Sequence, residues 1–213
     1  MLTELQQRPP AGAEVIVLSE HVDYWNHLGW EDPFSSSLFS ARQHQYSMKF
    51  RKESVYTPQM VVDGRAEALG SDASAVRSLI LDAAQRPHAT VRLHVRPDDP
   101  SDNHSKAVML HVEVSPAPKE LKERRWHAML AVTESGLASS VSRGENAGRR
   151  LLHTGVVRQF MRVAELDKLQ GNTYSADLKL SIQPQWNRDL MRAVVFVQSP
   201  DSHVVIGSGS CRI

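Results

Sequence analysis

The sequence contains a single cysteine, Cys211, among its 213 residues. One cysteine excludes an internal disulfide, a C-x-x-C pair and a zinc site built from several cysteine ligands. Because an apolar strand is expected immediately before Cys211, we expect its thiol to be buried and unreactive.

The sequence also has little net charge and no long hydrophobic run. Its 25 basic and 24 acidic side chains leave a formal net charge of +1, which gives no reason to expect nucleic acid or an acidic membrane as a partner. No run approaches the roughly 18 to 20 apolar residues that cross a bilayer, so no membrane insertion is expected. The N-terminus lacks the parts of a signal peptide, which predicts a cytoplasmic protein if the chain is taken literally.

Two glycine-containing segments lack the signature of a catalytic loop. Gly207 to Ser210 is without the G-x-S-x-G context of a serine hydrolase, and we expect it to be the flexible end of a strand. Gly144 to Arg149 has no Lys-Ser/Thr pair, so it is not a phosphate-binding loop. We therefore predict no catalytic residue in this chain and no cofactor.

The first 87 residues show a β-α-β-β-α pattern preceded by the end of a helix. Glu14 to Val22 is a near-continuous apolar run, which is typical of a strand covered on both faces. Asp63-Gly64 lies between two short apolar runs and is a strong hairpin signal. We expect a helix end over 2–5, a strand over 14–22, a helix over 37–50, hairpin strands over 60–62 and 66–69, and a helix over 73–85.

From residue 88 onward the pattern changes to short strands. In Leu178-Leu180-Ile182 apolar residues alternate with polar ones, which predicts a strand with one face in water. About seven strands at this spacing indicate an antiparallel β-sandwich. The predicted fold class is therefore α+β, with an α/β domain over 1–87 and a β-sandwich over 88–213. The strands are expected over 89–96, 106–115, 125–134, 150–163, 173–183, 191–198 and 203–208.

Thr57-Pro58 stands at the start of the first hairpin strand. The peptide bond before a proline adopts the cis form at a much lower cost than any other peptide bond. A cis Thr57–Pro58 bond would present the backbone of Thr57 at an edge, where an extended peptide can add as a further strand.

Three motifs carry a resemblance to a known family: EHVDYWNHLGWEDPF over 20–34, VYTPQMVVDGRAE over 55–67 and GENAGR over 144–149. Together they resemble a family of bacterial, mostly exported, thioredoxin-like proteins classed as domain of unknown function 1223. The resemblance implies a thioredoxin-like domain in which Pro58 opens the third strand. Relative to that fold, the first strand and most of the first helix are missing.

The same resemblance implies thiol–disulfide exchange on an extended peptide or a substrate protein. The family's C-x-x-C motif lies just upstream of the segment that matches residues 1–8, so this sequence departs from the family pattern by its absence. We accordingly expect an N-terminally truncated form. If an export signal lies upstream, the resemblance implies a periplasmic or secreted protein.

The loop over residues 24–34 is the candidate wall of a binding site. It leaves the strand expected over 14–22 at its carboxyl end, where ligand sites form in parallel sheets. There Tyr24, Trp25 and Trp30 could supply an apolar wall for a substrate chain bound at Thr57 and Pro58. An equally open alternative is that these rings fill the core. The neighbouring Asp23 is a candidate acid/base for thiol exchange in a longer form.

A second candidate binding site lies in the polar segment that follows residue 143. The family motif points to Glu145, Asn146, Arg149 and His153. The favoured alternative is structural, either a tight loop with positive φ at asparagine and glycine or an acid–base pair of Glu145 and Arg149 on a helix.

His21, Asp23 and His27 form an H-x-D-x-x-x-H pattern. Imidazole nitrogen and carboxylate oxygen are ligands for divalent metals. The favoured alternative is a cluster of hydrogen bonds, so no metal is predicted.

Two functional hypotheses follow. In the first, the chain is part of a thiol–disulfide oxidoreductase whose C-x-x-C segment is absent. In the second, it is a non-catalytic module that binds a peptide or protein at the Thr57-Pro58 edge.

Overall fold

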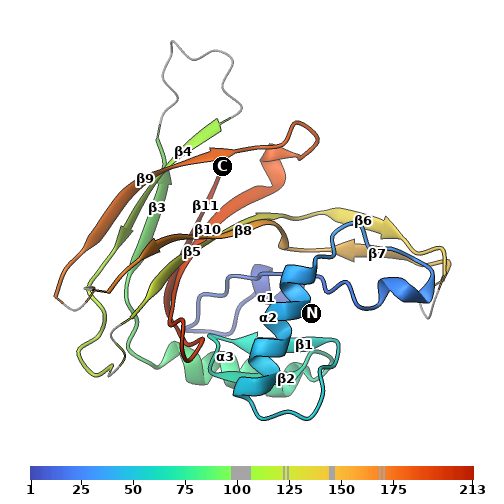
Figure 1. Ribbon diagram of the computed structural model, residues 1–213, viewed down its shortest axis with the longest axis horizontal. Coiled ribbons are helices and arrows are strands. Elements are labelled where there is room, and N and C mark those ends of the chain that lie inside the picture. The colour runs from blue at the N-terminus through green and yellow to red at the C-terminus, as the bar shows by residue number, and fades with distance from the viewer. Residues whose placement is uncertain (97–106, 122, 124, 144–146, 168, 170) are drawn as a thin grey trace. The chain divides into compact units, whose positions relative to one another are not determined.

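A computed structural model describes two compact units, each treated by itself below (Figure 1). The first unit comprises Met1–Gln85 and Ser135–Arg158, and the second comprises Arg86–Glu134 and Gln159–Ile213. No sequence pattern indicated that residues 135–158 belong to the first unit. The division into domains 1–87 and 88–213 stays a prediction. The described residues are 1–96, 107–121, 123, 125–143, 147–167, 169 and 171–213.

The first unit contains the helices and the hairpin that local sequence signals predict. Ser36 caps the second helix by accepting a hydrogen bond from the Leu38 N–H, and Asp72 caps the third in the same way. Asp63 and Gly64 both have positive φ, as the hairpin turn requires. The elements are α1 (Leu2–Gln7), η1 (Asn26–Leu28), α2 (Ser37–Lys49), β1 (Gln59–Val62), β2 (Ala66–Leu69), α3 (Ala73–Ala84), β6 (Leu137–Ser140) and β7 (Arg150–His153).

A small apolar cluster supports the β1–β2 hairpin. Its buried members are Leu5 of α1 with Val76 and Ile80, which lie one helical turn apart on α3. Met60 and Val62 of β1 pack against this cluster. A two-stranded sheet alone is marginally stable in water, so the hairpin depends on these helices.

The strand predicted over residues 14–22 is wrong. The segment forms a single parallel bridge between Ser19 and Val156, and no main-chain hydrogen bond of residues 14–18 occurs within the described part of the chain. An apolar run indicates burial, whereas a strand also needs a neighbouring strand as its hydrogen-bond partner. Gly155, at φ +63°, permits the bridge because a Cβ there would lie 2.6 Å from the carbonyl oxygen of Val17.

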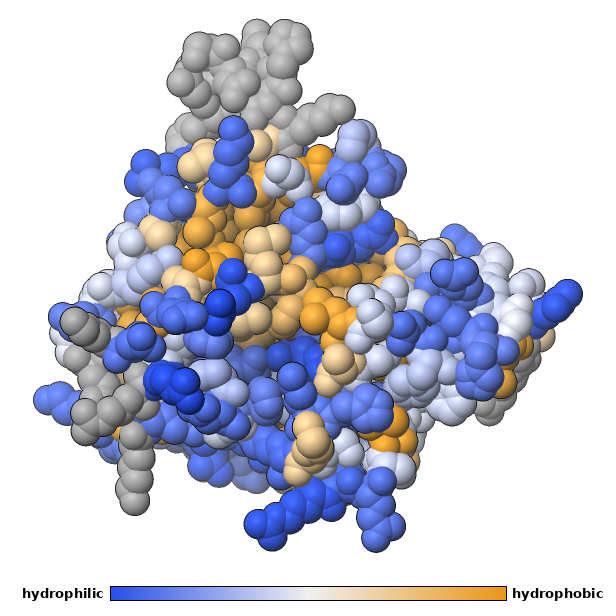
Figure 2. Space-filling model, viewed as in Figure 1, coloured by the Kyte–Doolittle hydropathy of each residue, from blue (hydrophilic) through white to orange (hydrophobic). Residues whose placement is uncertain are grey.

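The second unit is built from two antiparallel sheets. One has the order β11-β10-β5-β8 and the other the order β3-β4-β9. Their apolar faces share one core, to which β4 contributes fully buried Val108, Leu110 and Val112. Partly exposed apolar residues at the margin of this core appear in orange in Figure 2. The strands are β3 (Val91–Val95), β4 (Ala107–Val114), β5 (His127–Glu134), β8 (Val156–Glu165, whose residues up to Arg158 belong to the first unit), β9 (Tyr174–Ser181), β10 (Met191–Gln198) and β11 (Val205–Arg212), and η2 (Arg188–Leu190) precedes β10.

The glycines near the C-terminus lie inside β11, so the expectation of a flexible strand end is wrong. A Cβ on Gly207 would lie 2.1 Å from the carbonyl oxygen of Ala89, and one on Gly209 would lie 2.3 Å from that of Val91. The Ala89 N–H also donates to the Ile206 carbonyl at 2.6 Å. These glycines are therefore required by the close approach of two backbones.

Cys211 lies on β11 and is half-buried. Burial raises the pKa of its thiol, and the charge of Arg192 opposes this effect only in part. The thiol is thus less buried than expected, and a raised pKa favours its protonated, weakly nucleophilic form; an unreactive thiol stays a prediction.

The protein is thus mixed α and β, with few helices and several antiparallel sheets. Of the helices in the described residues, none has the length and hydropathy to cross a membrane.

Candidate functional site

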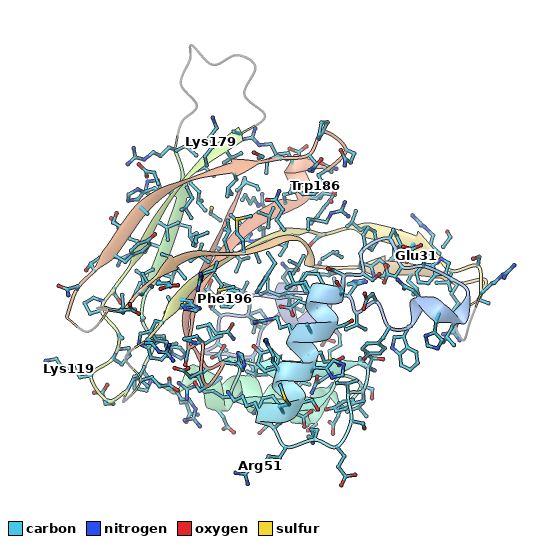
Figure 3. The ribbon with its side chains drawn as sticks, viewed as in Figure 1. Glu31, Arg51, Lys119, Lys179, Trp186 and Phe196 are labelled. Carbon is cyan, nitrogen blue, oxygen red and sulfur yellow. The ribbon has the colours of Figure 1, made fainter. Side chains whose placement is uncertain are left out.

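The candidate site belongs to the first unit and has two parts, an exposed backbone edge and an aromatic loop. The backbone edge is centred on Thr57 and Pro58, whose side chains are exposed and whose connecting peptide bond is cis. The aromatic loop is the segment over residues 23–34 and includes Glu31, which is labelled in Figure 3.

The register of the hairpin determines which main-chain groups of the edge are free. The Gly70 N–H donates to the Pro58 carbonyl at 2.7 Å, so Pro58 and every second residue after it face β2. Gln59 and Val61 therefore direct their N–H and C=O groups away from β2, while Thr57 lies before β1 on the other side of the cis bond. Among the described residues, the main-chain groups of Thr57 and these outward groups of Gln59 and Val61 have no hydrogen-bond partner.

The aromatic loop is ordered by its own hydrogen bonds. The Asp23 N–H donates to the Ser40 hydroxyl at 3.1 Å, and that hydroxyl donates to the Asp23 carboxylate at 2.5 Å. Further along, the Asn26 side chain donates to the Ser35 hydroxyl at 3.0 Å and accepts from the Asp32 N–H at 3.2 Å. These bonds fix both ends of the loop, and Gly29 at φ +94° ends η1 within it.

Two links join the aromatic loop to the backbone edge. The indole N–H of Trp25 donates to the Thr57 hydroxyl at 3.1 Å. The hydroxyl of Tyr24 donates to the side-chain oxygen of Gln43 at 2.8 Å, and the amide of Gln43 donates to the Tyr56 carbonyl at 2.8 Å. Burial raises the pKa of Tyr24, with an opposing effect of the Gln43 bond, so its hydroxyl stays a donor at neutral pH. The structure thus brings Tyr24 and Trp25 beside Thr57.

The other two candidate residues on this loop are Trp30 and Asp23. Trp30 is half-buried, and no hydrogen bond among the described residues joins it to Thr57. The Asp23 carboxylate is held by the Ser40 hydroxyl, which anchors the loop to α2.

A third network holds the chain just before the edge. The Tyr56 hydroxyl donates to Glu67 on β2, and Lys52 lies 2.5 Å from the other carboxylate oxygen of Glu67. The Glu67 side chain is only 8% exposed, so this ion pair is shielded from water on one side. Three consecutive residues, from Tyr56 to Pro58, are therefore fixed by separate partners.

Gln43 is the site residue that sequence reasoning missed as a functional residue. It lies on α2 at 9% exposure, on the face that carries Phe39 and Tyr46. A buried amide needs partners for both its oxygen and its nitrogen, and the sequence does not show where they come from. The signal was its polarity beside Phe39 and Tyr46 on the helix face, where Ser47 is also buried.

We predict that Gln43→Met lowers the free energy of unfolding by about 1 to 2 kcal/mol, because the Tyr24 hydroxyl and the Tyr56 carbonyl lose their partners in a partly buried setting. Urea unfolding measures the change. The matched control is Gln45→Met, two residues along α2 and exposed, which should leave stability unchanged. Equal stability of the two variants would show that the Gln43 bridge does not hold the site.

The second predicted site is only partly described. Glu145 and Asn146 lie outside the described residues. Arg149 is exposed, whereas His153 is half-buried on β7 and shares a hydrogen bond of 2.7 Å with the Ser139 hydroxyl.

The residues of the H-x-D-x-x-x-H pattern have separate partners. His21 donates to Asp32 at 2.6 Å, and His27 donates to the Tyr24 carbonyl at 2.6 Å. Asp23 is bonded to Ser40. In the part of the chain that the structure describes, no group of three histidine, cysteine or acidic side chains could hold a metal ion.

These features define a mixed α/β protein whose first unit presents an ordered, unpaired backbone edge beside an aromatic loop. A family model described as protein of unknown function (DUF1223) matches residues 1–198, and the chain belongs to this family. The family assignment from the three sequence motifs is confirmed.

A crystal structure of a protein from Agrobacterium tumefaciens, solved by a structural genomics consortium, has a similar fold. The two chains are 19% identical, with a TM-score of 0.72, and the match covers 98% of this chain and 83% of the other. A comparison with curated proteins gives no match.

Proposed function

We propose that the first unit binds an extended peptide segment of another protein by main-chain hydrogen bonds to the edge formed by Thr57, Gln59 and Val61. The observation that carries the proposal is that these outward N–H and C=O groups have no partner among the described residues, although their neighbours are firmly held. Ordered, unpaired strand edges bind extended peptides by strand addition.

Trp25 supplies side-chain contact to such a peptide. It is 48% exposed, and its bond to the Thr57 hydroxyl places the indole ring next to the edge. A tryptophan held in this way offers a large apolar surface at little further cost in side-chain entropy. The edge itself offers only main-chain hydrogen bonds, which do not depend on the side chains of the ligand. The proposed ligand class is therefore extended peptide chains.

The thioredoxin-like character of this unit and thiol–disulfide exchange belong to the proposal as well. In their support, a hairpin whose first strand follows a cis proline is succeeded by a helix, which is the order that the resemblance implies. Thiol–disulfide exchange requires a cysteine pair, which these 213 residues do not contain. Peptide binding is therefore the function proposed for this chain, and exchange is proposed only for a longer form with such a pair.

The experiment uses a fluorescein-labelled peptide of alternating threonine and valine with a lysine at each end. Fluorescence anisotropy should show saturable binding to the whole chain. An analogue with N-methyl groups on alternate amides keeps the side chains but loses the donors on one edge, so it should bind at least about tenfold more weakly. The matched analogue carries its methyl groups on the other set of alternate amides. It keeps the donors that the first analogue loses, so it should bind better than the first. Equal binding of all three peptides, or no binding, would refute strand addition at this edge.

A further inference from the structure

A compact cluster of ionisable side chains lies where the aromatic loop meets the β6–β7 hairpin, within the first unit. The imidazole of His21 donates to the Asp32 carboxylate at 2.6 Å, and the two side chains are 13% and 18% exposed. The ring of His153 lies 5.0 Å from the ring of His21 in an edge-to-face arrangement. This cluster is not used in the binding proposed above.

Apolar and polar partners surround the His153 ring. The ring of Phe34 packs edge-on against His153 at 5.4 Å and against His21 at 5.8 Å. Ser139 on β6 shares its hydroxyl with the Nε2 atom of His153 at 2.7 Å. The guanidinium of Arg158 lies over the Phe34 ring, 5.2 Å from its centre.

The charges that face His153 disfavour a proton on its ring. Among the described residues, a protonated His21 opposes a proton on His153 and the Asp32 carboxylate, already bonded to His21, favours it. Burial lowers the pKa of His153, and the charge of His21 lowers it further, against a smaller opposing effect of Asp32. Burial alone would raise the pKa of Asp32, but hydrogen bonds from His21 and the Phe34 N–H outweigh it and hold that pKa below its usual range. Asp32 therefore stays ionised when His153 titrates.

We propose that His21, Asp32, Phe34 and His153 form a pH-dependent latch that holds the aromatic loop against the β6–β7 hairpin and releases it when His153 gains a proton. His21 lies two residues before the aromatic loop and Asp32 lies near its end, so their pairing joins the start and the end of the loop. When both imidazole rings carry a proton, two positive charges lie side by side, and the repulsion is relieved when β7 and the loop separate. The loop carries Trp25, so release weakens the side-chain contact offered to a bound peptide.

The direction of the pH effect follows from the lowered pKa of His153. Above its usual value of 6.5 the ring is neutral in the latched and released states alike, and the latch is fully effective. As the pH falls below that value, the released state takes up the proton first, so the latch weakens. The loss therefore begins between neutral and mildly acidic pH, well above the range in which Asp32 is protonated.

The latch is tested by amide hydrogen exchange of the loop in the whole chain, read by mass spectrometry and corrected for the intrinsic rate at each pH. In the wild-type protein, protection of residues 24–35 should fall about fivefold between pH about 7.5 and pH about 5.5. In His153→Gln, which keeps a partner for Ser139 but cannot be protonated, protection should not change with pH. His44→Gln, an exposed histidine on α2, is the matched control and should behave as the wild type.

The affinity for the threonine–valine peptide, measured across the same pH range, rests on the proposed function and should fall about fivefold in parallel with loop protection. Loop protection that is independent of pH in the wild type, or that still falls in His153→Gln, would overturn the latch. Release of the loop without peptide binding at any pH would instead refute the proposed function and leave the latch standing.

Discussion

Gly207→Ala is expected to lower the free energy of unfolding of the second unit by about 3 kcal/mol or more. The added methyl group would lie 2.1 Å from the carbonyl oxygen of Ala89, and that oxygen belongs to the backbone of a neighbouring segment. A side chain could rotate away, whereas the backbone can move only if the Ala89 N–H also gives up its 2.6 Å bond to Ile206. Backbone entropy alone predicts the opposite sign, because glycine-to-alanine exchange at an unstrained position stabilises a protein by about 0.4 to 1 kcal/mol.

Guanidinium unfolding followed by circular dichroism measures this effect. The matched control is Ser208→Ala, the adjacent residue of β11, whose side chain is exposed on the other face of the strand. It should change stability by less than about 0.5 kcal/mol. A Gly207→Ala variant as stable as the wild type would mean that the two backbones do not approach as closely as described.

Trp25→Ala is expected to weaken binding of the threonine–valine peptide by about 30-fold or more, which corresponds to roughly 2 kcal/mol. In the proposed binding mode the indole ring contributes in two ways, since its exposed surface is available to the peptide and its N–H holds the Thr57 hydroxyl at 3.1 Å. Trp25→Phe separates the two contributions, because phenylalanine keeps an aromatic surface and lacks the donor. Its affinity should lie between those of the wild type and the alanine variant.

Anisotropy titrations of the three proteins measure the effect. Leu152→Ala is the control, because Leu152 is 75% exposed in the same unit and has no place in the proposed site. It should bind the peptide as the wild type does. If both alanine variants lose affinity to the same degree, the contribution of Trp25 is general surface hydrophobicity and the assigned contact is wrong.

The elements of the first unit that could be predicted from sequence are those that depend on near neighbours. Ser36 and Asp72 accept bonds from residues two and three positions ahead, and Asp63-Gly64 closes its own turn. Such signals act within one turn of the chain and need no knowledge of the fold. For the same reason the helix bounds agree with the structure to within about one or two residues.

The features that could not be predicted depend on residues far apart in sequence. Gln43 joins Tyr24 to Tyr56, and His153 meets His21 only because residues 135–158 fold back into the first unit. The strand predicted over 14–22 was wrong for a related reason. Its apolar pattern indicates burial and says nothing about a hydrogen-bond partner. Periodicity is a property of one segment, whereas pairing is a property of two.

The unpaired edge at Thr57, Gln59 and Val61 has a consequence for how the protein behaves in solution. Open strand edges are templates for any extended chain, including a second copy of the same protein. The exposed run Arg51, Lys52 and Glu53 just before the edge supplies charge of both signs, which discourages close stacking of identical chains. The peptide binding proposed for this edge and self-association would therefore compete for one set of backbone groups, and an occupied edge would protect the protein against aggregation.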